Sequence, residues 1–542
     1  MPVQVRSAAS TARFEGRSAT VKRVLLSLLV AFGLLGSAFA QQPGSTLVVG
    51  MSILPNTIDS GDANDANAIA VTRQIVERLV ELAPGNEGLV PGLASSWEAN
   101  DDSTEWTFHL LQGVKFHDGT PFNAEAVKFS LDRWNDAANP YHFGAEGKAY
   151  VGWRNLFGGF LGDGSAVSEV VVDDEYTVTL KLTRSISFLP SLLAGGYFGF
   201  DSPTAVMAAG ANYGTPSVGS VGTGPYRFER WEEGSRVVLT ANTEYRDGPP
   251  PTETVVFVGV SDPTARLAQL KAGALDIAAA ISPSDLDSVL SDPNLELVQG
   301  EGGLNTSYLA MHQNQKPMDD VRVRQAVAYA VDRVAIVDAF YAGQAVAAED
   351  IIPDSLWGHA DGVGGYPYDP AKARELLTEA GYPNGFDTEL WYRNSGLEPV
   401  IAEAIASYLA DVGIRAALKT EDWAAFLADY MAGNFPLYTL GWNADFADPD
   451  TFIYTFYGPQ AVRRFGWNAP EVVALTQEAR QVPGQAERAA LYAQVVTAAH
   501  EAMPMLPLAH QSQFFVVRKG VTGLVLNPLG AFPVLTGTSK AQ

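Results

Sequence analysis

The stretch from residue 388 to residue 442 constrains the fold more than any other, because it alternates short apolar strands with longer helical segments. Short runs bounded by turn residues predict strands, and apolar residues spaced three and four apart predict helices. The expected elements are strand 388–392, helix 398–411, strand 414–419, helix 423–432 and strand 437–442. Such alternation with short links is typical of a mainly parallel sheet with helices on its faces. The sequence therefore predicts an α/β fold.

Other segments follow the same pattern. Asp262 with Pro263, and again Asp369 with Pro370, can supply the N-cap and the first helical residue of two helices. Further expected elements are strand 46–51, helix 67–83, strand 255–260, a helix to residue 272, strand 276–279 and a helix that Gly381 ends. Between residues 140 and 215 the periodicity is weak, which indicates a lobe of low regularity.

The stretch 106–127, WTFHLLQGVKFHDGTPFNAEAV, combines a strand, a turn and the start of a helix. Trp106, Phe108 and Leu110 alternate with polar residues and predict a half-buried strand. Asp118 followed by glycine favours a tight turn, and Asn123 can cap a helix with an apolar stripe at positions 127, 131 and 134. These residues are expected to be scaffold and not binding site.

This stretch resembles a signature of the extracellular solute-binding proteins of the dipeptide, oligopeptide and nickel class, the receptors of ABC importers. Four further blocks resemble the same family in the same order: LVPGLASSW at 89–97, VGTGPY at 221–226, DVRVRQA at 320–326 and GWNADFADPD at 441–450. The chain departs from the family at Gln112, where Arg is usual, at Glu125, where Asp is usual, and at 311–314, where an aromatic residue and Asn usually end a strand.

The resemblance implies a fold like that of the type II periplasmic binding proteins, with two α/β lobes that close on a ligand and an extra inserted lobe. Lobe I would comprise residues 41–77, 220–303 and 506–542, lobe II would be the insertion 78–219, and lobe III would be residues 304–505. The ligand would lie between lobes I and III, which two connections near residues 303 and 505 join like a hinge.

The first forty residues have the pattern of an export signal. Lys22 and Arg23 precede a twelve-residue apolar run, and small residues before position 41 predict cleavage after Ala40. Residues 1–20 precede the basic pair and are interpreted as an extension from a misplaced start. Many members of the family carry a lipid on a cysteine at the cleavage site, but this chain has no cysteine. A freely diffusing periplasmic protein is therefore expected.

The composition narrows the function further. A formal net charge of −25 at pH 7 disfavours nucleic acid and anionic membranes as partners. The sequence contains no HExxH zinc motif, no GxSxG elbow and no phosphate-binding loop. The chain is therefore not expected to be an enzyme, and neither a cofactor nor a metal is expected.

The resemblance also indicates candidate ligand contacts near residue 445. Asp445 follows Gly-Trp where peptide-binding members of the family place the aspartate that pairs with the α-amino group of the ligand. A carboxylate in a closed cleft can hold an ammonium through charge-assisted hydrogen bonds. The alternative is a turn or capping acid, since DPD follows at 448–450. Trp442 would form a wall of the cleft, or else belong to the core.

The remaining contacts are expected from the main chain and from arginine. The backbone from Gly441 to Asn443 can pair with an extended peptide as an added strand, and the segment 76–79, which contains Arg78 and Leu79, can do so from lobe I. Arg393 lies close to where dipeptide binders place an arginine for the ligand's carboxylate, and its planar fork suits a bidentate contact. The alternative for Arg393 is an ordinary surface arginine.

The sequence thus predicts a periplasmic substrate-binding receptor of an ABC importer. It would trap a di- or oligopeptide between two closing lobes and deliver it, as a monomer, to a membrane permease with a cytoplasmic ATPase. An oligosaccharide, an opine or a nickel chelate is the alternative ligand for the same class of receptor. A secreted hydrolase with two acids in its cleft is the alternative from another class, and no motif supports it.

Overall fold

The computed structural model describes residues 46–83, 88–300, 302–359, 363, 365–530 and 534–541. All of them belong to one compact unit, Ser45–Ala541. The predicted export signal, with its cleavage after Ala40, lies outside the described residues. Among the helices of the described part, none combines the length and the apolar composition that crossing a membrane requires.

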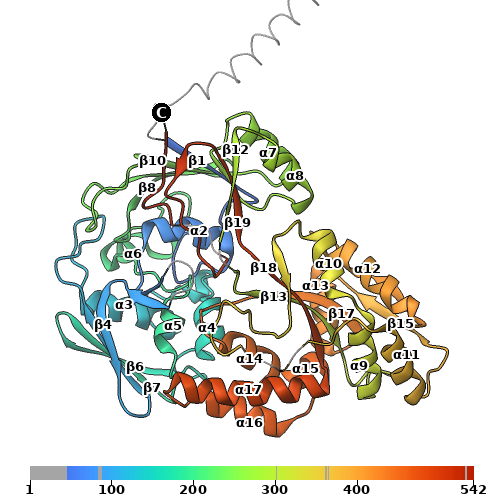
Figure 1. The fold of residues 1–542 in the computed structure, drawn as a ribbon. Coiled ribbons are helices and arrows are strands. Elements are labelled where there is room, and N and C mark those ends of the chain that lie inside the picture. Colours follow the sequence, from blue (N-terminus) through green and yellow to red (C-terminus); the bar gives the residue numbers. More distant parts are fainter. Residues whose placement is uncertain are drawn as a thin grey trace, which may run out of the picture. The chain divides into compact units, whose positions relative to one another are not determined.

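A seven-stranded sheet has the order β12-β19-β11-β1-β10-β9-β8. Figure 1 labels β1, β8, β10, β12 and β19 among its strands. Its strands are β1 (Thr46–Met51), β8 (Tyr226–Glu232), β9 (Arg236–Ala241), β10 (Thr254–Gly259), β11 (Ile277–Ala278), β12 (Leu295–Gln299) and β19 (Phe514–Arg518). Strand β1 has its predicted bounds and runs parallel to β10 and β11, whereas the other pairs are antiparallel. Strands from both ends of the chain therefore share one sheet.

Helix α2 (Ala66–Ile75) packs beside this sheet and is shorter than predicted. The expected helix 67–83 is wrong beyond residue 75, where the backbone becomes extended. The N–H of Gly224 donates to the carbonyl of Ile75 at 2.8 Å. A loop distant in sequence thus supplies the hydrogen bond that a further helical turn would have made. The chain continues into β2 (Val80–Leu82), which pairs with β3 (Leu89–Pro91).

Two further helices accompany the seven-stranded sheet. Helix α7 (Pro263–Lys271) begins as predicted, because the side chain of Asp262 accepts a hydrogen bond from the N–H of Ala265. Helix α8 (Leu286–Leu290) precedes β12. The short pair β20 (Val521–Thr522) and β21 (Ser539–Lys540) lies near the C-terminus.

A four-stranded antiparallel sheet has the order β4-β5-β7-β6. Its strands are β4 (Ala94–Ala99), β5 (Glu105–Leu110), β6 (Val167–Asp174) and β7 (Thr177–Leu182). Strand β5 is the predicted strand, and its residues Trp106, Phe108 and Leu110 are buried. Strands β6 and β7 make the region 140–215 more regular than its periodicity indicates, because β6 is an edge strand with few buried positions.

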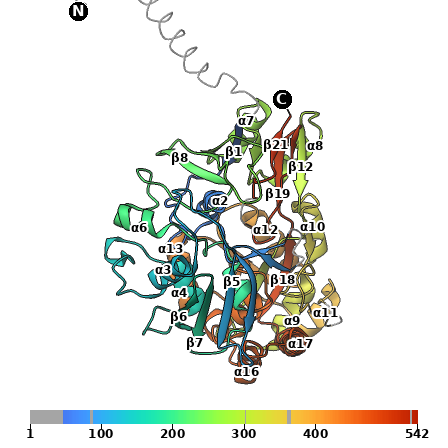
Figure 2. The same cartoon turned by 90° about the vertical axis from the view of Figure 1, so that its left-hand side faces the viewer.

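Helix α3 (Ala124–Asn135) packs against β6 and β7. The side chain of Asn123 accepts a hydrogen bond from the N–H of Ala126, which confirms the predicted cap. The predicted stripe at positions 127, 131 and 134 is at most 1% exposed. Figure 2 shows α3 and α4 (Val151–Phe157) near strands β5 to β7. The short helices α5 (Leu189–Leu193) and α6 (Pro203–Ala209) follow.

A six-stranded mixed sheet has the order β14-β18-β13-β17-β15-β16. Its strands are β13 (Asn305–Met311), β14 (Ala345–Ala347), β15 (Phe386–Trp391), β16 (Ile414–Lys419), β17 (Leu437–Asn443) and β18 (Met505–Gln511). Strand β15 is parallel to β16 and β17, but the pairs that involve β13 and β18 are antiparallel. The expectation of a mainly parallel sheet is therefore wrong here, because β13 and β18 enter from outside the alternating run.

Nine helices accompany this sheet among the described residues, and the sequence pattern predicts α11, α12 and α13. They are α9 (Val321–Ala330), α10 (Arg333–Phe340), α11 (Pro370–Glu379), α12 (Glu398–Asp411), α13 (Trp423–Ala432), α14 (Asp450–Tyr457), α15 (Ala461–Phe465), α16 (Pro470–Ala479) and α17 (Gln485–Ala502). Helices α12 and α13 and strand β16 have their predicted bounds. The side chain of Asp369 caps α11, as expected.

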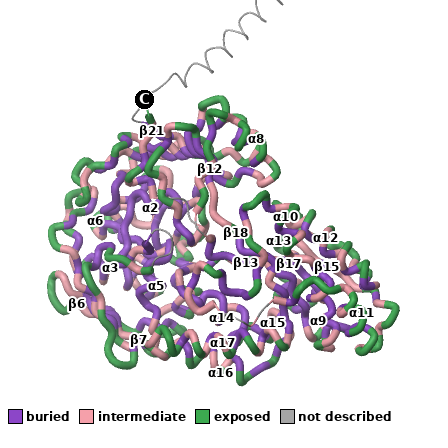
Figure 3. The backbone as a smooth tube through the Cα atoms, in the orientation of Figure 1, coloured by how far each residue is buried: buried purple, intermediate pink, exposed green. Residues whose placement is uncertain are grey.

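Buried apolar residues form separate clusters around the three large sheets. Figure 3 shows buried segments on the inside and exposed ones on the outer loops and helix faces. These features confirm the α/β class. The division into three lobes stays a prediction, and its boundary near residue 505 falls at the first residue of β18.

Candidate ligand-binding cleft

A cleft of about 540 Å³ lies at the C-terminal end of β17. Residues of β13 and β17, the start of α12 and residues 511–514 line it. Four of the predicted contacts, Gly441, Trp442, Asn443 and Arg393, belong to this lining. The structure thus brings these four residues together, although 48 positions separate Arg393 from Gly441.

The backbone of β17 is open on one side of this cleft. On its other side, residues 437–443 pair with β13 along their full length, with Gly441 opposite Ser307 and Asn443 opposite Asn305. Strand β15 pairs only with Leu437 and Tyr438. Within the described strands, residues 439–443 therefore have no partner on the β15 side. An exposed edge of this kind can accept an extended peptide as an additional strand.

Trp442 forms a half-buried wall of the cleft and also contacts the core. Its ring meets Phe456 edge-on at a centroid distance of 6.0 Å, and the guanidinium of Arg464 lies 5.6 Å from its centroid. Its indole nitrogen is buried and has no hydrogen-bond partner within the described chain. The side chain thus lines the cleft and contacts the core, and its role toward a ligand stays a prediction.

Arg393 lies at the rim of the cleft and is already paired. Its Nε donates to Oε1 of Glu398 at 2.8 Å, and its backbone N–H donates to Oε2 of the same residue at 3.1 Å. Its guanidinium also lies 5.4 Å from the ring centroid of Trp423. A ligand carboxylate would have to compete with Glu398, a residue that sequence reasoning assigned only to a helix start.

Asp445 follows β17 and faces the segment 195–197. The hydroxyl of Tyr197 donates to its carboxylate at 3.3 Å, and its backbone N–H donates to the hydroxyl of Thr451 at 3.2 Å. Burial raises the pKa of Asp445 to about 6, although the hydrogen bond from Tyr197 lowers it. Among the described residues, no Lys, Arg or His forms an ion pair with it. The carboxylate is thus partly desolvated and pairs with no cation of the described residues.

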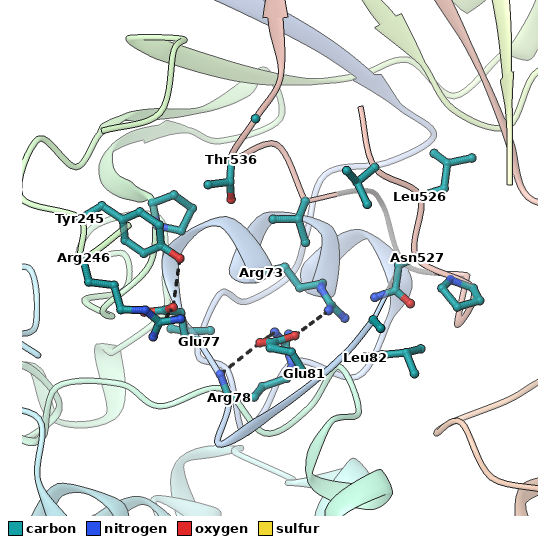
Figure 4. Close-up of a pocket in the computed structure, with 17 residues that line it drawn as sticks. Arg73, Glu77, Arg78, Glu81, Leu82, Tyr245, Arg246, Leu526, Asn527 and Thr536 are labelled. Atoms are coloured by element: carbon teal, nitrogen blue, oxygen red, sulfur yellow. Dashed lines mark hydrogen bonds and ion pairs between the residues drawn. The ribbon is translucent and has the colours of Figure 1, made fainter. Parts of the chain in front are cut away.

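Arg78 and Leu79 are buried in the fold. The Arg78 guanidinium donates to the carbonyls of Gly195 at 2.9 Å and Gly196 at 3.3 Å and pairs with Glu81 at 3.2 Å. The Leu79 side chain is fully buried in the core, and its carbonyl accepts from the N–H of Ala94 at 2.9 Å. Neither residue lines the cleft beside β17. Arg78 instead lines a second cavity (Figure 4).

Tyr197 contacts the candidate residue Asp445, and sequence reasoning missed this contact. Its loop carried a signal, because the stretch 195–200 reads GGYFGF and is rich in glycine and aromatic residues. That composition indicated a loop but not its partner. Within the described part of the chain, no group of three or more His, Asp or Glu could hold a metal ion. The expectation that the protein needs no metal stays a prediction.

Comparison with known proteins gave consistent matches. The model of the family "Bacterial extracellular solute-binding proteins, family 5 Middle" matches residues 88–463. The chain is 34% identical to the dipeptide-binding protein of Escherichia coli strain K12, over 88% of this chain and 90% of that protein. It is also 34% identical to heme-binding protein A of Haemophilus influenzae, over 85% of this chain and 86% of that protein.

A solved structure has a similar fold. It is the dipeptide-binding protein of Pseudoalteromonas sp. SM9913 in complex with Met-Leu, with a TM-score of 0.76 and 26% identity. The match covers 92% of this chain and all of the other.

Proposed function

Because this chain belongs to the bacterial extracellular solute-binding proteins of family 5, we propose that it is a periplasmic receptor that delivers di- or oligopeptides to an ABC permease. The relatives named above are solute-binding proteins, and none of their names describes an enzyme. The peptide would lie between two lobes that close on it, and the permease would receive it from the closed receptor.

The observation that carries the peptide assignment is the combination of an open strand edge with a cation-free carboxylate. Residues 439–443 offer backbone donors and acceptors to a peptide main chain. Asp445 follows this edge by two residues, outside the lining of the cleft, and its partly desolvated carboxylate would gain from an ammonium. A peptide with a free N-terminus has both matching features.

The other contacts follow from this placement. Trp442 would contact the first side chains of the peptide, and Gly441 and Asn443 would pair with its backbone. Arg393 would release Glu398 and bind the terminal carboxylate of a short peptide in its place. Arg78 and Leu79 would act indirectly, by holding the backbone of the segment 76–79 in place.

The first test is native mass spectrometry of the protein purified without denaturation. A series of peptide masses is expected, since main-chain recognition tolerates many side chains. A single mass of heme, a sugar, an opine or a metal chelate would keep the receptor class and overturn the peptide assignment. Heme is among these outcomes because the chain is similar to heme-binding protein A of Haemophilus influenzae.

The second test addresses Asp445 directly. Asp445→Asn keeps the shape and removes the charge, so peptides with a free N-terminus should bind about tenfold to a hundredfold more weakly. N-acetylated peptides should bind the variant and the parent equally. Calorimetric titration measures both, and Asp387→Asn, which changes a carboxylate that is exposed and distant from the cleft, is the control. Equal losses for both kinds of peptide would remove the amine-binding role.

A further inference from the structure

A second cavity of about 280 Å³ lies at the C-terminal end of α2. It shares no lining residue with the cleft beside β17. Figure 4 shows Arg73 and Glu81 in the middle of this site, with Glu77 and Arg246 on one side and Asn527 on the other. The rest of the wall is largely apolar and includes Leu82, Val525 and Leu526.

Arg73 is the unusual group in this cavity. Its side chain is 2% exposed, and only Nη2 has a partner, Oε2 of Glu81 at 3.1 Å. Its Nε and Nη1 are buried without a hydrogen-bond partner in the described part of the chain. A buried donor without a partner destabilises the fold, and a charged one does so more strongly. Two donors of the guanidinium thus lack an acceptor among the described residues.

The charges around the cavity do not balance. Glu81 pairs with both Arg73 and Arg78, at 3.1 and 3.2 Å, so one carboxylate serves two guanidinium groups. Glu77 pairs with Arg246 at 2.9 Å and therefore compensates a different arginine. The five charged residues that line the cavity leave an excess of one positive charge when all are ionised. A bound anion would neutralise the excess positive charge of the lining and would supply hydrogen-bond acceptors for Arg73.

We propose that this cavity binds a small carboxylate, which accepts hydrogen bonds from Arg73 and places a short apolar chain against Leu82, Val525 and Leu526. The cavity volume of about 280 Å³ lies just below the range of ordinary ligand pockets, which begins at about 300 Å³. An acid of only a few carbons therefore suits it. An ammonium would meet excess positive charge. A neutral amide would offer an acceptor but leave the charge uncompensated.

Two sources could supply this chemistry. The carboxylate can belong to a free organic acid, or it can be the acidic end of a ligand that also enters the cleft. In either case the site is defined by Arg73 and not by Asp445, so it stands even if the peptide assignment is overturned.

The experiment is a calorimetric titration of the full mature chain with propionate, propionamide and n-propylammonium. Propionate is expected to bind at one saturable site, propionamide about tenfold more weakly or worse, and n-propylammonium not at all. Arg73→Gln should abolish propionate binding. Arg415→Gln, which removes the same charge from an exposed residue paired with Asp387, should leave it unchanged.

A second variant keeps the proposal testable if Arg73→Gln does not fold. Val525 is 43% exposed at the wall of the cavity, so Val525→Trp can fill the space and leave Arg73 in place. It should also abolish propionate binding. Equal binding of propionate and propionamide, an absence of saturation, or full binding by Arg73→Gln would overturn the proposal and leave a cavity that holds water only.

A competition arm distinguishes the two sources. If a dipeptide that binds the cleft displaces propionate one for one, the cavity takes the carboxylate of the same ligand, and the contact of that carboxylate with Arg393 is overturned. If both bind together, the cavity takes a separate acid.

Discussion

Asp445 is a carboxylate whose environment disfavours its charge. Burial raises its pKa to about 6, and the hydroxyl of Tyr197 offsets only part of this effect. The N-terminal ammonium of a peptide, with an ordinary pKa near about 8, stays charged through the whole range in which Asp445 titrates. Below about pH 7, binding of a free N-terminus should therefore depend on pH through Asp445 and not through the ammonium.

Peptide affinity should fall as the pH is lowered through 6. Protonation of Asp445 removes the negative charge that attracts the ammonium, so a decrease of about tenfold is expected between pH 7.5 and pH 5. Titrations at a series of pH values measure it. N-acetylated peptides, and the variant Asp445→Asn with any peptide, should show a flat profile. The same slope for acetylated peptides would place the titrating group elsewhere.

The same residue should reduce the stability of the ligand-free protein. The folded-state pKa of about 6 exceeds the ordinary value of 3.8, so the folded state binds more protons than the unfolded state between these values. The penalty is complete above pH 6 and disappears below pH 4. Asp445→Asn should therefore stabilise the free protein by roughly 2 kcal/mol at pH 8 and by little at pH 4. Thermal unfolding at the two pH values measures this, and destabilisation at pH 8 would contradict it.

At the scale of elements, the open edge of β17 leads us to expect that the backbone N–H groups of the peptide, and not its side chains, determine binding at this strand. In strand pairing, only alternate residues direct their N–H groups toward the partner. N-methylation of a tetrapeptide at successive positions should therefore alternate between a loss of about tenfold and no loss. Binding by the unmodified protein measures this pattern. A uniform loss at every position would contradict strand addition.

Gly441→Leu provides the matched protein variant. A Cβ at Gly441 would meet only the carbonyl oxygen of Thr306, at an ordinary 3.5 Å, so the fold should tolerate the change. Peptide binding should nevertheless weaken, because the side chain of an exposed cleft residue would occupy ligand space. Unchanged affinity together with an unchanged melting temperature would show that the peptide lies elsewhere.

The elements also show where sequence patterns succeed. Helices α12 and α13 and strand β16 could be predicted to the residue, because their apolar periodicity is local and Asp422 caps α13. The end of α2 could not, since the N–H of Gly224 ends it from about 150 positions away. The six-stranded sheet is mixed because β13 and β18 pair antiparallel with their neighbours. The local sequence of these two strands does not show which strands they pair with, so this arrangement could not be predicted.

The candidate site shows the same division. The block at 441–450 indicated Trp442 and Asp445 as candidates, but the contact between Asp445 and Tyr197 joins residues 248 positions apart. Arg393 could be named, whereas its pairing with Glu398 depends on how the chain turns between β15 and α12. Such contacts follow from the tertiary fold, so only the structure reveals them.

For the whole molecule, one buried ion pair ties distant segments together. Arg133 of α3 donates to Asp59 at 3.0 Å, and Lys148 lies 3.0 Å from the same carboxylate. Although burial raises the pKa of Asp59, Arg133 and Lys148 hold it below its usual value. The segment after β1 is thus fixed to the region of the four-stranded sheet.

Arg133→Met should lower the free energy of unfolding by about 3 kcal/mol, because it leaves Asp59 buried with only Lys148 to compensate it. Denaturant titration measures the change. The double variant Asp59→Asn with Arg133→Met should recover part of the loss, since it removes the uncompensated charge. Arg415→Met, at an exposed pair, should change the value by less than about 0.5 kcal/mol. A double variant less stable than Arg133→Met would contradict this explanation.

The open edge of β17 has a further consequence for the behaviour of the protein in concentrated solution. Unpaired backbone groups on a strand serve as a template for any other chain, including a second copy of the same protein. The edge spans only residues 439–443, which limits how many hydrogen bonds a wrong partner can form. Self-association that grows with protein concentration and disappears at saturating ligand would be the expected cost of keeping these five residues available.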